Sequence, residues 1–566
     1  MVHALETLRT RVDEVRLPLT LPGVQGSRAD RGQLLDQLDD YLIPRLRQLD
    51  APLLAVVGGS TGAGKSTLVN SVLRREVTRA GVLRPTTRSP VLVHHPEDAR
   101  WFTTNRILPS LARITGDDPE PSPEATQHRI GAVRLMACDA LPEGFALLDA
   151  PDIDSVVDAN RELAAQLLAA GDLWLFVTTA ARYADAVPWD LLRTAAERGT
   201  SVAVVLDRVP PEAMDEVRTD LAGMLAANSL SDAPLFTIPE VALQDGLLPS
   251  GVMAKLRLWF MDLASSSAAR QEVVRRTLGG ALDSLGVRVP ALAGAADEQA
   301  AADQSLREEV AQCYGVAATR LEAGLTDGTL LRGEVLARWQ EFVGTGEVLR
   351  GLESAVGRVR DRLVSAITGK PAPAEPLGQA LQTGVAALVH AEAAQASEQA
   401  VLRWRTHPAG AALIGPNPTE MSRLSPDFDQ RMERMVRDWQ GHVLDLVRQQ
   451  AGSKRSQARY MSLGVNAIGI TLMILVFAST AAIPTGAEVG VGAGTAVVGQ
   501  RLLEAIFGDQ AVRQLAAEAR RDLMARVEGL LQGEQDRLID LLVEAGVDPD
   551  AGPGLRAAGE KVQATR

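Results

Sequence analysis

The sequence predicts an α/β domain joined to an elongated all-α helical bundle, and three observations support this division. Short apolar segments alternate with helical patterns from residue 51 to about residue 250. From residue 251 onward the strand patterns stop, and Ala, Leu, Glu and Arg recur at helical spacing. A third stretch, 461–500, is almost free of charge. Because 566 residues are too many for one hydrophobic core, we expect at least two domains.

The composition argues against several classes of protein. The formal net charge is -13, so we expect no nucleic-acid partner. The two cysteines, Cys138 and Cys313, lie far apart and outside any C-x-x-C pair, so we expect neither a disulfide framework nor a zinc site. The first residues mix charged and apolar side chains without an apolar signal core, so we expect the N-terminal part to stay in the cytoplasm.

Residues 1–50 are expected to form helices that precede the first strand. Apolar residues recur at helical spacing over 3–17 and again over 31–49, where Pro44 should distort the helix. These helices can pack on the helical bundle or on the α/β domain, and the sequence leaves both arrangements open.

The α/β domain is expected to span residues 51–250. Short apolar runs within it predict seven strands, with helices between most of them. The predicted strands are Leu53–Val57, Val91–His94, Val133–Met136, Ala146–Leu148, Leu173–Val177, Val202–Leu206 and Leu235–Ile238.

Residues 251–460 are expected to form the helical bundle. The clearest apolar stripe advances by four, three, four and four residues through Leu306, Val310, Cys313, Ala317 and Leu321. The proline-rich stretch 371–376 indicates a hinge or a stiff linker. Aromatic side chains of the region, Trp339, Phe342 and Trp404, are expected to pack inside the bundle.

The C-terminal region is expected to return to the bundle. Residues 501–545 repeat the helical pattern, with an apolar stripe through Leu515, Ala519, Leu523, Val527, Leu530 and Leu538. Residues 546–566 are polar and contain glycine and proline, so we expect a flexible tail.

The stretch 461–500 is expected to contact a membrane. Residues 460–487 carry no charge, and the run from Leu463 to Ile483 has the length needed to cross the hydrocarbon core of a bilayer. Arginines flank the stretch on both sides, which favours a hairpin that inserts and returns to the cytoplasmic face. The alternative is a hairpin of core helices buried in a water-soluble bundle.

A glycine-rich loop follows the first predicted strand and precedes a predicted helix. Gly59, Gly64, Lys65 and Ser66 satisfy the pattern G-x-x-x-x-G-K-S/T. In such a loop the backbone N–H groups surround phosphate oxygens, the lysine reaches the β and γ phosphates, and the serine hydroxyl binds Mg²⁺. The predicted nucleotide-binding residues are Gly59, Ser60, Thr61, Gly62, Ala63, Gly64, Lys65, Ser66 and Thr67.

Two further segments predict catalytic and metal-binding residues beside Lys65. Thr87, with Thr86 as second choice, lies about twenty residues beyond Lys65 and just before a strand, where a switch threonine would complete the Mg²⁺ shell. Asp149 ends an apolar strand, where a carboxylate can hold Mg²⁺ through water. Neither His94 nor His95 has metal-ligand spacing.

The motifs taken together resemble those of the bacterial dynamin-like large GTPases, particularly actinobacterial members. The resemblance lies in G-G-S-T-G-A-G-K-S-T, P-T-T-R-S-P-V-L-V, L-L-D-A-P-D-I-D-S and T-T-A-A-R-Y-A-D-A-V-P-W. It implies a P-loop GTPase domain with Mg²⁺, a helical stalk, a membrane-inserting paddle at 461–500 and nucleotide-driven self-assembly on membranes. By position it assigns the phosphate loop to Gly59–Ser66, the switch threonine to Thr87 and the metal-water aspartate to Asp149.

The sequence departs from the family pattern at two positions. Asp152 stands where the family usually has a glycine whose N–H meets the γ-phosphate. The guanine-reading motif is normally N/T-K-x-D, but here it is Asp207-Arg208-Val209-Pro210, so Pro210 replaces the base-reading aspartate. Asp207 and Arg208 remain the predicted base-site residues, with Arg208 stacking on the base ring as lysine does in the family. Arg88 or Arg182 could stabilise charge during hydrolysis, although either also fits a surface residue.

These expectations define one main function and two alternatives. The main one is a GTPase that couples GTP hydrolysis to self-assembly and remodelling of the cytoplasmic membrane at its inner face, with division sites as one setting implied by the resemblance. Its expected partners are GTP, membrane lipid, further copies of the chain and a sister dynamin-like protein. One alternative is a membrane-anchored nucleotide-dependent scaffold with slow turnover. A remote alternative, an ABC-type transport ATPase, lacks its signature sequence, and Ala150 follows Asp149 where that class requires glutamate.

Overall fold

The chain forms two compact units in a computed structural model. Unit 1 contains Met1–Leu17, Gly23–Glu298 and Asp548–Arg566, and unit 2 contains Pro18–Pro22 and Gln299–Val547. The structure describes residues 1–78, 90–104, 107–108, 111–115, 132–154, 158–327, 330, 335, 337–338, 374–416, 418–450, 465–477, 503–504 and 507–566. Each unit has its own hydrophobic core, as expected for a chain of this length.

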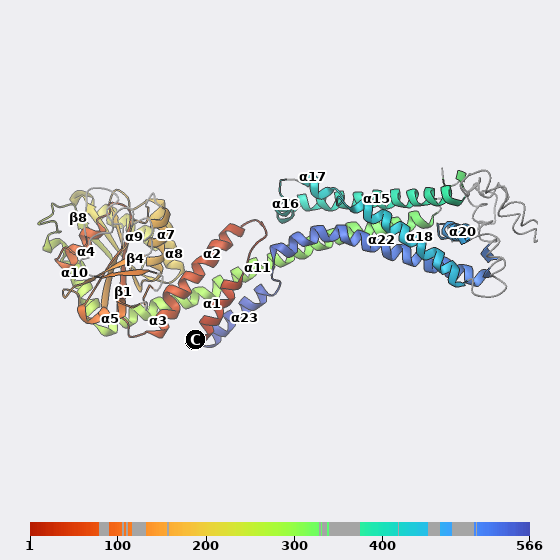
Figure 1. The fold of residues 1–566 in the computed structure, drawn as a ribbon. Coiled ribbons are helices and arrows are strands. Elements are labelled where there is room, and N and C mark those ends of the chain that lie inside the picture. The colour runs from red at the N-terminus through yellow and green to blue at the C-terminus, as the bar shows by residue number, and fades with distance from the viewer. Residues whose placement is uncertain are drawn as a thin grey trace, which may run out of the picture. The chain divides into compact units, whose positions relative to one another are not determined.

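An eight-stranded sheet lies at the centre of the α/β part of unit 1 (Figure 1). Its strand order is β3-β4-β2-β5-β1-β6-β7-β8. All neighbouring pairs are parallel except β2 and β5, which are antiparallel, so the sheet is mixed. The strands are β1 (Leu53–Gly59), β2 (Val91–His94), β3 (Ala112–Thr115), β4 (Ala132–Ala137), β5 (Phe145–Asp149), β6 (Leu173–Thr179), β7 (Ser201–Val209) and β8 (Leu235–Pro239).

All seven predicted strands are confirmed, and β3 is an addition. Four of the confirmed strands, β1, β2, β5 and β6, are apolar runs buried along their whole length, which is the pattern expected of strands covered on both faces. Strand β3 reads A-R-I-T and lies at the sheet edge with no buried residue, so it carries no apolar run from which to predict it.

Helices cover both faces of the sheet. Successive side chains of a strand point to opposite faces, so alternate residues of β1 belong to two different cores. Leu54 and Val56 belong to one core, whereas Leu53, Ala55 and Val57 belong to the other. The helices of this part are α4 (Lys65–Leu73), η2 (Pro96–Asp98), α5 (Ala99–Phe102), α7 (Asp158–Ala169), α8 (Ala186–Glu197), η3 (Pro211–Ala213), α9 (Met214–Ala227) and α10 (Ser250–Ser265).

The α/β domain extends past the predicted boundary at residue 250. Met253, Leu256 and Phe260 of α10 are buried in the same core as the first residues of β1. Phe260 meets Phe145 edge to face, with ring centroids 5.8 Å apart. Helix α10 therefore belongs to this domain and not to the bundle, because its apolar face covers the sheet.

The N-terminal helices of unit 1 form a separate helical cluster. They are α1 (Val2–Glu14), α2 (Val24–Asp36), the π-helical segment η1 (Gln37–Leu42) and α3 (Ile43–Arg47). Their apolar faces share a core with residues 281–296 of the long helix α11 (Ser267–Thr326) and with α23 (Ala551–Ala564). The distortion predicted at Pro44 is present, since the π-helical segment comes just before this proline.

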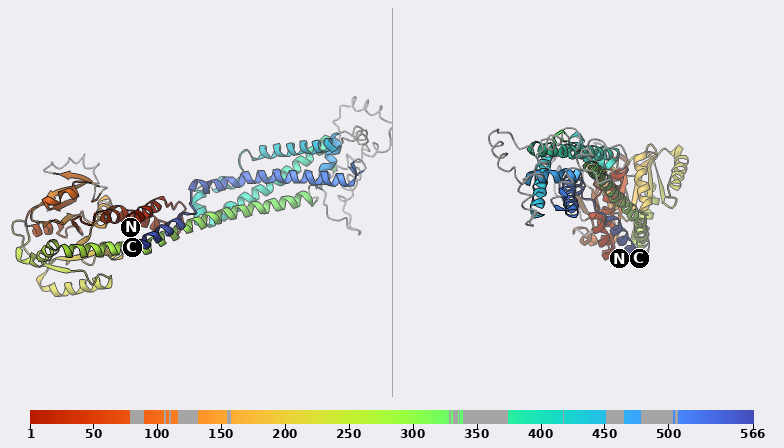
Figure 2. Two further views of the ribbon diagram at one scale, coloured as in Figure 1. Left: turned by 90° about the horizontal axis from the view of Figure 1, so that it is seen from below. Right: turned by 90° about the vertical axis from the view of Figure 1, so that its right-hand side faces the viewer.

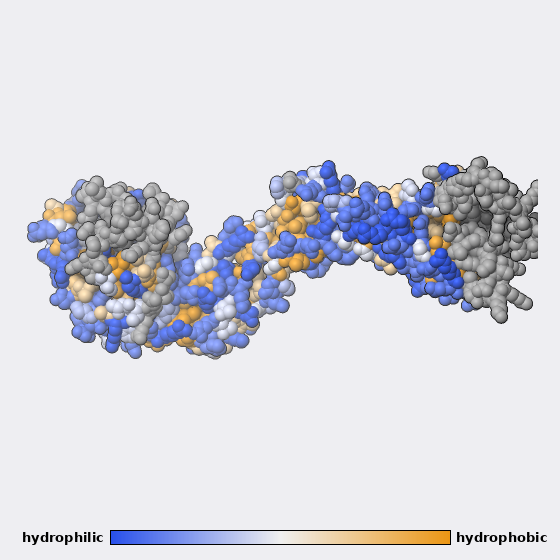
Figure 3. Space-filling model, viewed as in Figure 1, coloured by the Kyte–Doolittle hydropathy of each residue, from blue (hydrophilic) through white to orange (hydrophobic). Residues whose placement is uncertain are grey.

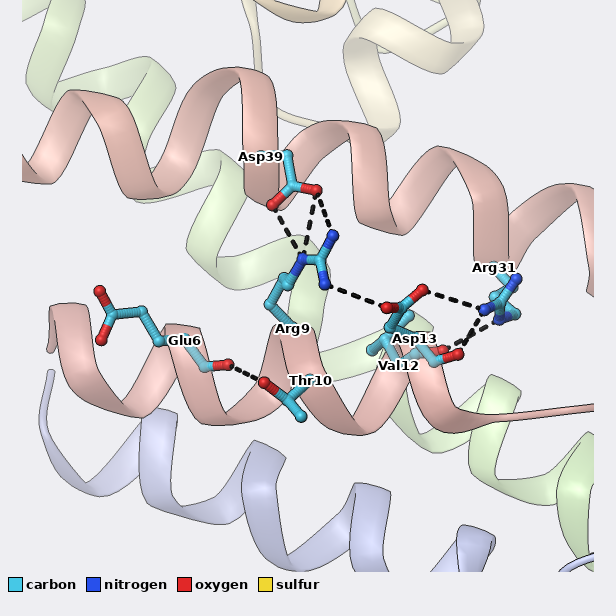
Figure 4. A network of polar contacts seen from close by, with 7 residues as sticks. All are labelled: Glu6, Arg9, Thr10, Val12, Asp13, Arg31 and Asp39. Carbon is cyan, nitrogen blue, oxygen red and sulfur yellow. Dashed lines mark hydrogen bonds and ion pairs between the residues drawn. The ribbon is translucent and has the colours of Figure 1, made fainter. Parts of the chain in front are cut away.

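Polar contacts tie α1 to α2 and η1 (Figure 4). The Arg9 guanidinium donates to Asp39 from Nε and Nη2, each over 3.1 Å, and to Asp13. Arg31 donates from Nε to the Val12 carbonyl oxygen over 3.0 Å. These groups are partly exposed, so their contribution is about 1 kcal/mol or less per pair, and the apolar core contributes most of the stability.

The flexible tail predicted for 546–566 is wrong, because most of it is helix α23. Leu555, Ala558 and Val562 are buried in the cluster that includes α1. Consequently the two chain termini lie side by side (Figure 2), and Thr565 Oγ1 is 3.8 Å from Met1 Sδ. This helix contains a proline, which the sequence analysis counted against a helix. Pro553 lies in the first helical turn, where its missing N–H has no intrahelical partner to lose.

Unit 2 is a helical bundle. It contains the later part of α11 together with α15 (Ala374–Thr406), α16 (Pro408–Ile414), α17 (Pro418–Ser422), α18 (Phe428–Gln450), α20 (Val465–Phe477) and α22 (Asp509–Ala545). Every residue of the two predicted apolar stripes is buried. In the view of Figure 3 the described surface of this unit is mostly hydrophilic, as expected when amphipathic helices turn their apolar faces inward.

Trp404 is a packing residue of this bundle, as predicted. Its side chain is fully buried, and Nε1 donates to the Leu306 carbonyl oxygen over 3.1 Å. Trp339 and Phe342 lie outside the described residues. Helix α15 begins at Ala374, so the last three residues of the predicted linker 371–376 are helical.

The described part of the apolar stretch 461–500 packs inside the bundle. Helix α20 has 13 residues, and five of its apolar side chains are buried in the core shared with α18 and α22. The buried members are Ile470, Leu472, Met473, Val476 and Phe477. No helix in the described part of the chain is long and apolar enough to cross a membrane. Residues 478–500 lie outside the described part, so the predicted hairpin stays a prediction.

Candidate functional site

The glycine-rich loop lies between β1 and α4, as its sequence predicts. Gly59 has φ 154°, and a Cβ there would stand 2.1 Å from the Val177 carbonyl oxygen of the neighbouring strand. Only glycine fits this position, because the clash is with backbone that the sheet holds in place. Gly62 and Gly64 also have positive φ values, of 74° and 90°, and Gly64 precedes the first residue of α4.

Lys65 is the first residue of α4, and its side chain is buried against the loop. Its Nζ donates to the carbonyl oxygens of Gly59 and Ser60, over 2.9 Å and 3.2 Å. It also forms an ion pair with the Asp152 carboxylate. Each acceptor takes one of the three N–H bonds of the ammonium group, so the lysine is held at the mouth of the loop.

Ser66 and Asp149, which the sequence predicts as metal-binding residues, lie in direct contact. The Ser66 hydroxyl donates to Asp149 Oδ2 over 2.6 Å. Asp149 is fully buried at the end of β5, and this burial, opposed by the Ser66 hydrogen bond, raises its pKa to about 6. Its other oxygen, Oδ1, has no hydrogen-bond partner among the described residues.

These atoms fit a bound Mg²⁺. A hydroxyl and a carboxylate are hard oxygen ligands, and Mg²⁺ is usually held by one or two such groups with water and substrate phosphates. A cation would also satisfy the buried Oδ1 atom that lacks a partner. Thr86, Thr87 and Arg88 lie outside the described residues, so the predicted switch threonine stays a prediction.

Asp154 and Arg182 hold Thr61 in the middle of the loop. The backbone N–H and the hydroxyl of Thr61 both donate to Asp154 Oδ1, over 2.6 Å and 2.7 Å. Arg182 donates to the Thr61 carbonyl oxygen over 2.9 Å and lies 3.0 Å from Asp154 Oδ2. Arg182, predicted as either a charge stabiliser or a surface residue, is thus part of the site. Asp154 was not predicted, because its contact with Thr61 spans 93 positions in the chain.

Asp207 and Arg208 also lie beside the loop. Arg208 donates from Nη2 to the Gly62 carbonyl oxygen over 2.7 Å, and its own N–H donates to Asp207 Oδ1 over 2.9 Å. Asp207 is buried close to Gly64, and burial raises its pKa to about 6. Pro210 follows with no side-chain donor or acceptor, so only Asp207 and Arg208 of this motif offer polar side chains to a base.

The remaining predicted residues take structural positions around the loop. The Ser60 hydroxyl is buried without a hydrogen-bond partner in the described part of the chain. Thr67 lies in α4, where its carbonyl oxygen accepts from the Ser71 hydroxyl over 2.6 Å. His94 stacks on Phe102, and no group of His, Cys, Asp or Glu that could hold a metal ion by itself occurs among the described residues.

A residue missed from the sequence, Asn70 of α4, orders the chain after that helix. Its Oδ1 accepts from the N–H groups of Val77 and Thr78, over 2.9 Å and 3.0 Å, and its Nδ2 donates to the Thr78 carbonyl oxygen over 2.7 Å. An asparagine within a helix is the signal that could have suggested such a role, since its amide competes for backbone groups nearby. Asn70 thereby fixes the start of the segment that leads towards Thr87.

A family match includes the residues of this site. Residues 54–209 match the model of the dynamin family. A search of curated proteins gave no match. Two similar solved structures are both described as an oligomerised bacterial dynamin pair with a mechanism for long-range sensing and tethering of membranes. The first is 9% identical, with a TM-score of 0.43 and coverage of 100% of this chain and 95% of that chain. The second is 10% identical, with a TM-score of 0.41 and coverage of 94% of each chain.

A third similar structure is the LeoA bacterial dynamin GTPase from ETEC. It is 10% identical, with a TM-score of 0.24 and coverage of 95% of this chain and 97% of that chain. These scores are low, so the assignment depends on the family match and on the residues that it contains. The matched residues include the phosphate loop, the Ser66–Asp149 contact and Arg182. Residues 54–209 of the α/β domain therefore match the dynamin family, and the match includes the phosphate loop of a P-loop GTPase.

Proposed function

We propose that this protein hydrolyses GTP with Mg²⁺ and couples hydrolysis to self-assembly on the cytoplasmic face of the cell membrane, which it remodels. One observation carries the proposal. Inside the dynamin-family match, Lys65, Ser66 and Asp149 converge at the end of β1, and these residue types bind phosphate and Mg²⁺ in phosphoryl-transfer sites. The helical unit and the apolar stretch 461–500 support the membrane part of the proposal.

The site performs hydrolysis mainly by positioning and by charge. Lys65 and the loop N–H groups at the N-terminus of α4 bind the phosphates and stabilise the charge that develops on them. The Ser66 hydroxyl would hold Mg²⁺ directly and Asp149 would hold it through water, and a bound ion would supply positive charge to the phosphates. Thr87 is proposed to complete this shell. We assign no side chain as general base, so we expect slow basal turnover that rises on assembly.

Guanine is the proposed base, on the strength of the family. Arg208 is anchored to Gly62 at the loop, where its guanidinium can stack on a purine ring, as lysine does in the family. Asp207 lies beside it, with Oδ2 3.9 Å from Arg208 Nε, and its carboxylate could accept from a base N–H. Comparing GTP with ATP as substrate tests this part separately from the rest.

Hydrolysis is tested with the wild-type protein and with Lys65→Ala, using GTP and ATP, with and without vesicles. We expect GTP hydrolysis that vesicles stimulate, and a loss of about a hundredfold or more in Lys65→Ala, because the lysine charge acts on the transition state. Ser66→Ala should raise the Mg²⁺ concentration needed for half-maximal activity. The proposal is wrong if the wild-type protein hydrolyses neither nucleotide.

Lipid contact is assigned to residues 478–500, because α20 is already buried in the bundle core. Deleting all of 461–500 would remove α20 and damage the bundle, so point substitutions are the better test. Val497→Glu with Val498→Glu should leave the protein in the supernatant when vesicles are sedimented, since charged side chains are costly in lipid. Val543→Glu is the matched control, because Val543 is 61% exposed on α22. Sedimentation of the double variant at the wild-type level would contradict the assignment.

The slow scaffold remains a second candidate, and the Lys65–Asp152 ion pair favours it. This contact engages the catalytic lysine with a carboxylate at the position where the family usually has glycine. Tubulated or fused vesicles together with stimulated phosphate release would favour remodelling. Vesicle binding with neither effect would favour the scaffold. Binding of further copies, or of a sister dynamin-like protein, is part of both proposals.

A further inference from the structure

All three N–H bonds of the Lys65 ammonium have acceptors within unit 1. Two acceptors are neutral carbonyl oxygens of the loop, and the third is the Asp152 carboxylate. The lysine side chain is 5% exposed and that of Asp152 is 22% exposed, so water screens this pair poorly. A phosphate oxygen can reach Nζ only if one acceptor leaves. Asp152 is the one that a phosphate would repel.

A second carboxylate binds the loop in the same way. Asp154 Oδ1 accepts both the N–H and the hydroxyl of Thr61, and its Oδ2 pairs with Arg182. Burial raises the pKa of Asp154, but the Thr61 hydrogen bonds and the Arg182 charge outweigh it, and the net pKa lies below the ordinary value. Asp154 is therefore an ionised carboxylate that accepts a hydrogen bond from the Thr61 N–H of the phosphate loop.

Phosphate and carboxylate oxygens compete for the same donors. Loop N–H groups and a lysine ammonium attract any anionic oxygen, and a charge-assisted hydrogen bond is about twice as strong as a neutral one. Asp152 and Asp154 lie on one short segment directly after β5, two positions apart, with Ile153 between them. The Ile153 N–H donates to the Gly59 carbonyl oxygen over 3.4 Å, which keeps this segment against the loop.

We propose that Asp152 and Asp154 are internal competitors of the nucleotide, whose carboxylates occupy Lys65 and Thr61 and exchange for phosphate oxygens when a triphosphate binds. The exchange releases residues 150–154 from the loop, so occupancy of the site is converted into movement of the segment that follows Asp149. This inference rests on the proposed function in one respect, that the loop binds a nucleoside triphosphate. It assigns to Asp152 the control of nucleotide affinity.

The first test measures the affinity of the full-length protein for a fluorescent GTP analogue with Mg²⁺. Asp152→Asn keeps the side-chain shape and removes its charge, so the analogue should bind about tenfold more tightly because it no longer displaces an anion from Lys65. Asp154→Asn should tighten binding by a few fold. Asp190→Asn is the control for a change in net charge, because Asp190 is exposed on α8 and pairs only with its helical neighbour Arg193 among the described ion pairs. The control should bind like the wild type.

The second test separates competition from a merely structural ion pair. Without nucleotide, Asp152→Asn should unfold at a lower temperature than the wild type, because a buried lysine loses its anionic partner. At saturating GTP analogue the difference should disappear, since phosphate then pairs with Lys65 in both proteins. A structural pair would leave the same deficit at every nucleotide concentration, and that result would overturn the proposal.

The outcomes also distinguish this inference from the proposed function. Failure of the wild-type protein to bind GTP or ATP would refute the proposed function. Wild-type binding with equal or weaker binding by Asp152→Asn would refute the inference alone. If Asp152→Asn does not fold, Asp154→Asn decides the question, and an affinity equal to that of the wild type would overturn the proposal.

Discussion

Replacing Gly280 by alanine should destabilise unit 1, whereas the same replacement at the neighbouring Gly279 should stabilise it. Both glycines lie in α11, but only Gly280 faces the α/β domain. A Cβ at Gly280 would lie 2.6 Å from Gly199 Cα and 2.8 Å from its carbonyl oxygen. A Cβ at Gly279 would meet nothing within 4 Å.

The magnitude follows from three effects. Alanine in place of a helical glycine gains about 1 kcal/mol at either position. At Gly280 the new methyl group meets backbone atoms, so the helix must shift outward, and overpacking of this kind costs about 1–3 kcal/mol. The shift also strains the Thr277 hydroxyl, which donates to the Asp172 carbonyl oxygen over 2.8 Å and accepts from the Ser201 N–H over 3.1 Å. Each of these bonds contributes about 1 kcal/mol.

We therefore expect Gly280→Ala to lose about 1–3 kcal/mol and Gly279→Ala to gain about 0.5–1 kcal/mol. In thermal unfolding followed by circular dichroism, Gly279→Ala should have the highest midpoint, the wild type an intermediate one and Gly280→Ala the lowest. Because unit 1 is larger than 250 residues, a shift of about 2 °C or less per kcal/mol is expected. Equal midpoints for the two variants would refute the close approach of α11 to Gly199, and with it the packing of this helix on the α/β domain.

Two further predictions concern the helical cluster of unit 1. Burial raises the pKa of Asp40 to about 6, although Gln166 donates to it over 3.0 Å. This carboxyl binds its proton more tightly in the folded state, so its unfavourable contribution is fully present above about pH 6 and is relieved as the pH falls towards 4. Asp40→Asn should raise stability at pH 7 by about 1–3 kcal/mol, with no gain at pH 4, as urea unfolding at both pH values would show. Leu555→Ala should cost about 2–5 kcal/mol because Leu555 is fully buried in α23, whereas Glu560→Ala on the exposed face should cost little. Equal unfolding midpoints for the two α23 variants would contradict the packing of α23 and support the flexible tail predicted from the sequence.

Local patterns were sufficient for most of the fold. The strands that proved correct are apolar runs, and the burial of the central ones on both faces leaves little freedom in their composition. The two bundle stripes were predictable because a helix buries every third or fourth residue. Strand β3 and helix α23 were missed because each depends on its neighbour. Helix α23 approaches α11 so closely that a Cβ at Gly552 would lie 2.0 Å from Asp297 Oδ1.

In the candidate site, too, some residues were predictable from the local sequence and others were not. Gly59, Lys65 and Ser66 were recognisable because one short stretch holds the strand end, the turn and the helix start. Asp149 was recognisable because it ends an apolar strand. The contacts of Asp152 and Asp154 were not, because they bridge 87 and 93 positions of the chain. A carboxylate in a turn does not reveal which donor it will meet.

The sequence by itself determined the residues of the phosphate loop and seven of the eight described strands, because both depend on residues adjacent in the chain. Only the tertiary structure decided which groups engage that loop, where the α/β domain ends, and which helices bury the apolar face of α20. These outcomes depend on contacts between distant segments, and helical or strand periodicity shows that a face is buried without showing what buries it.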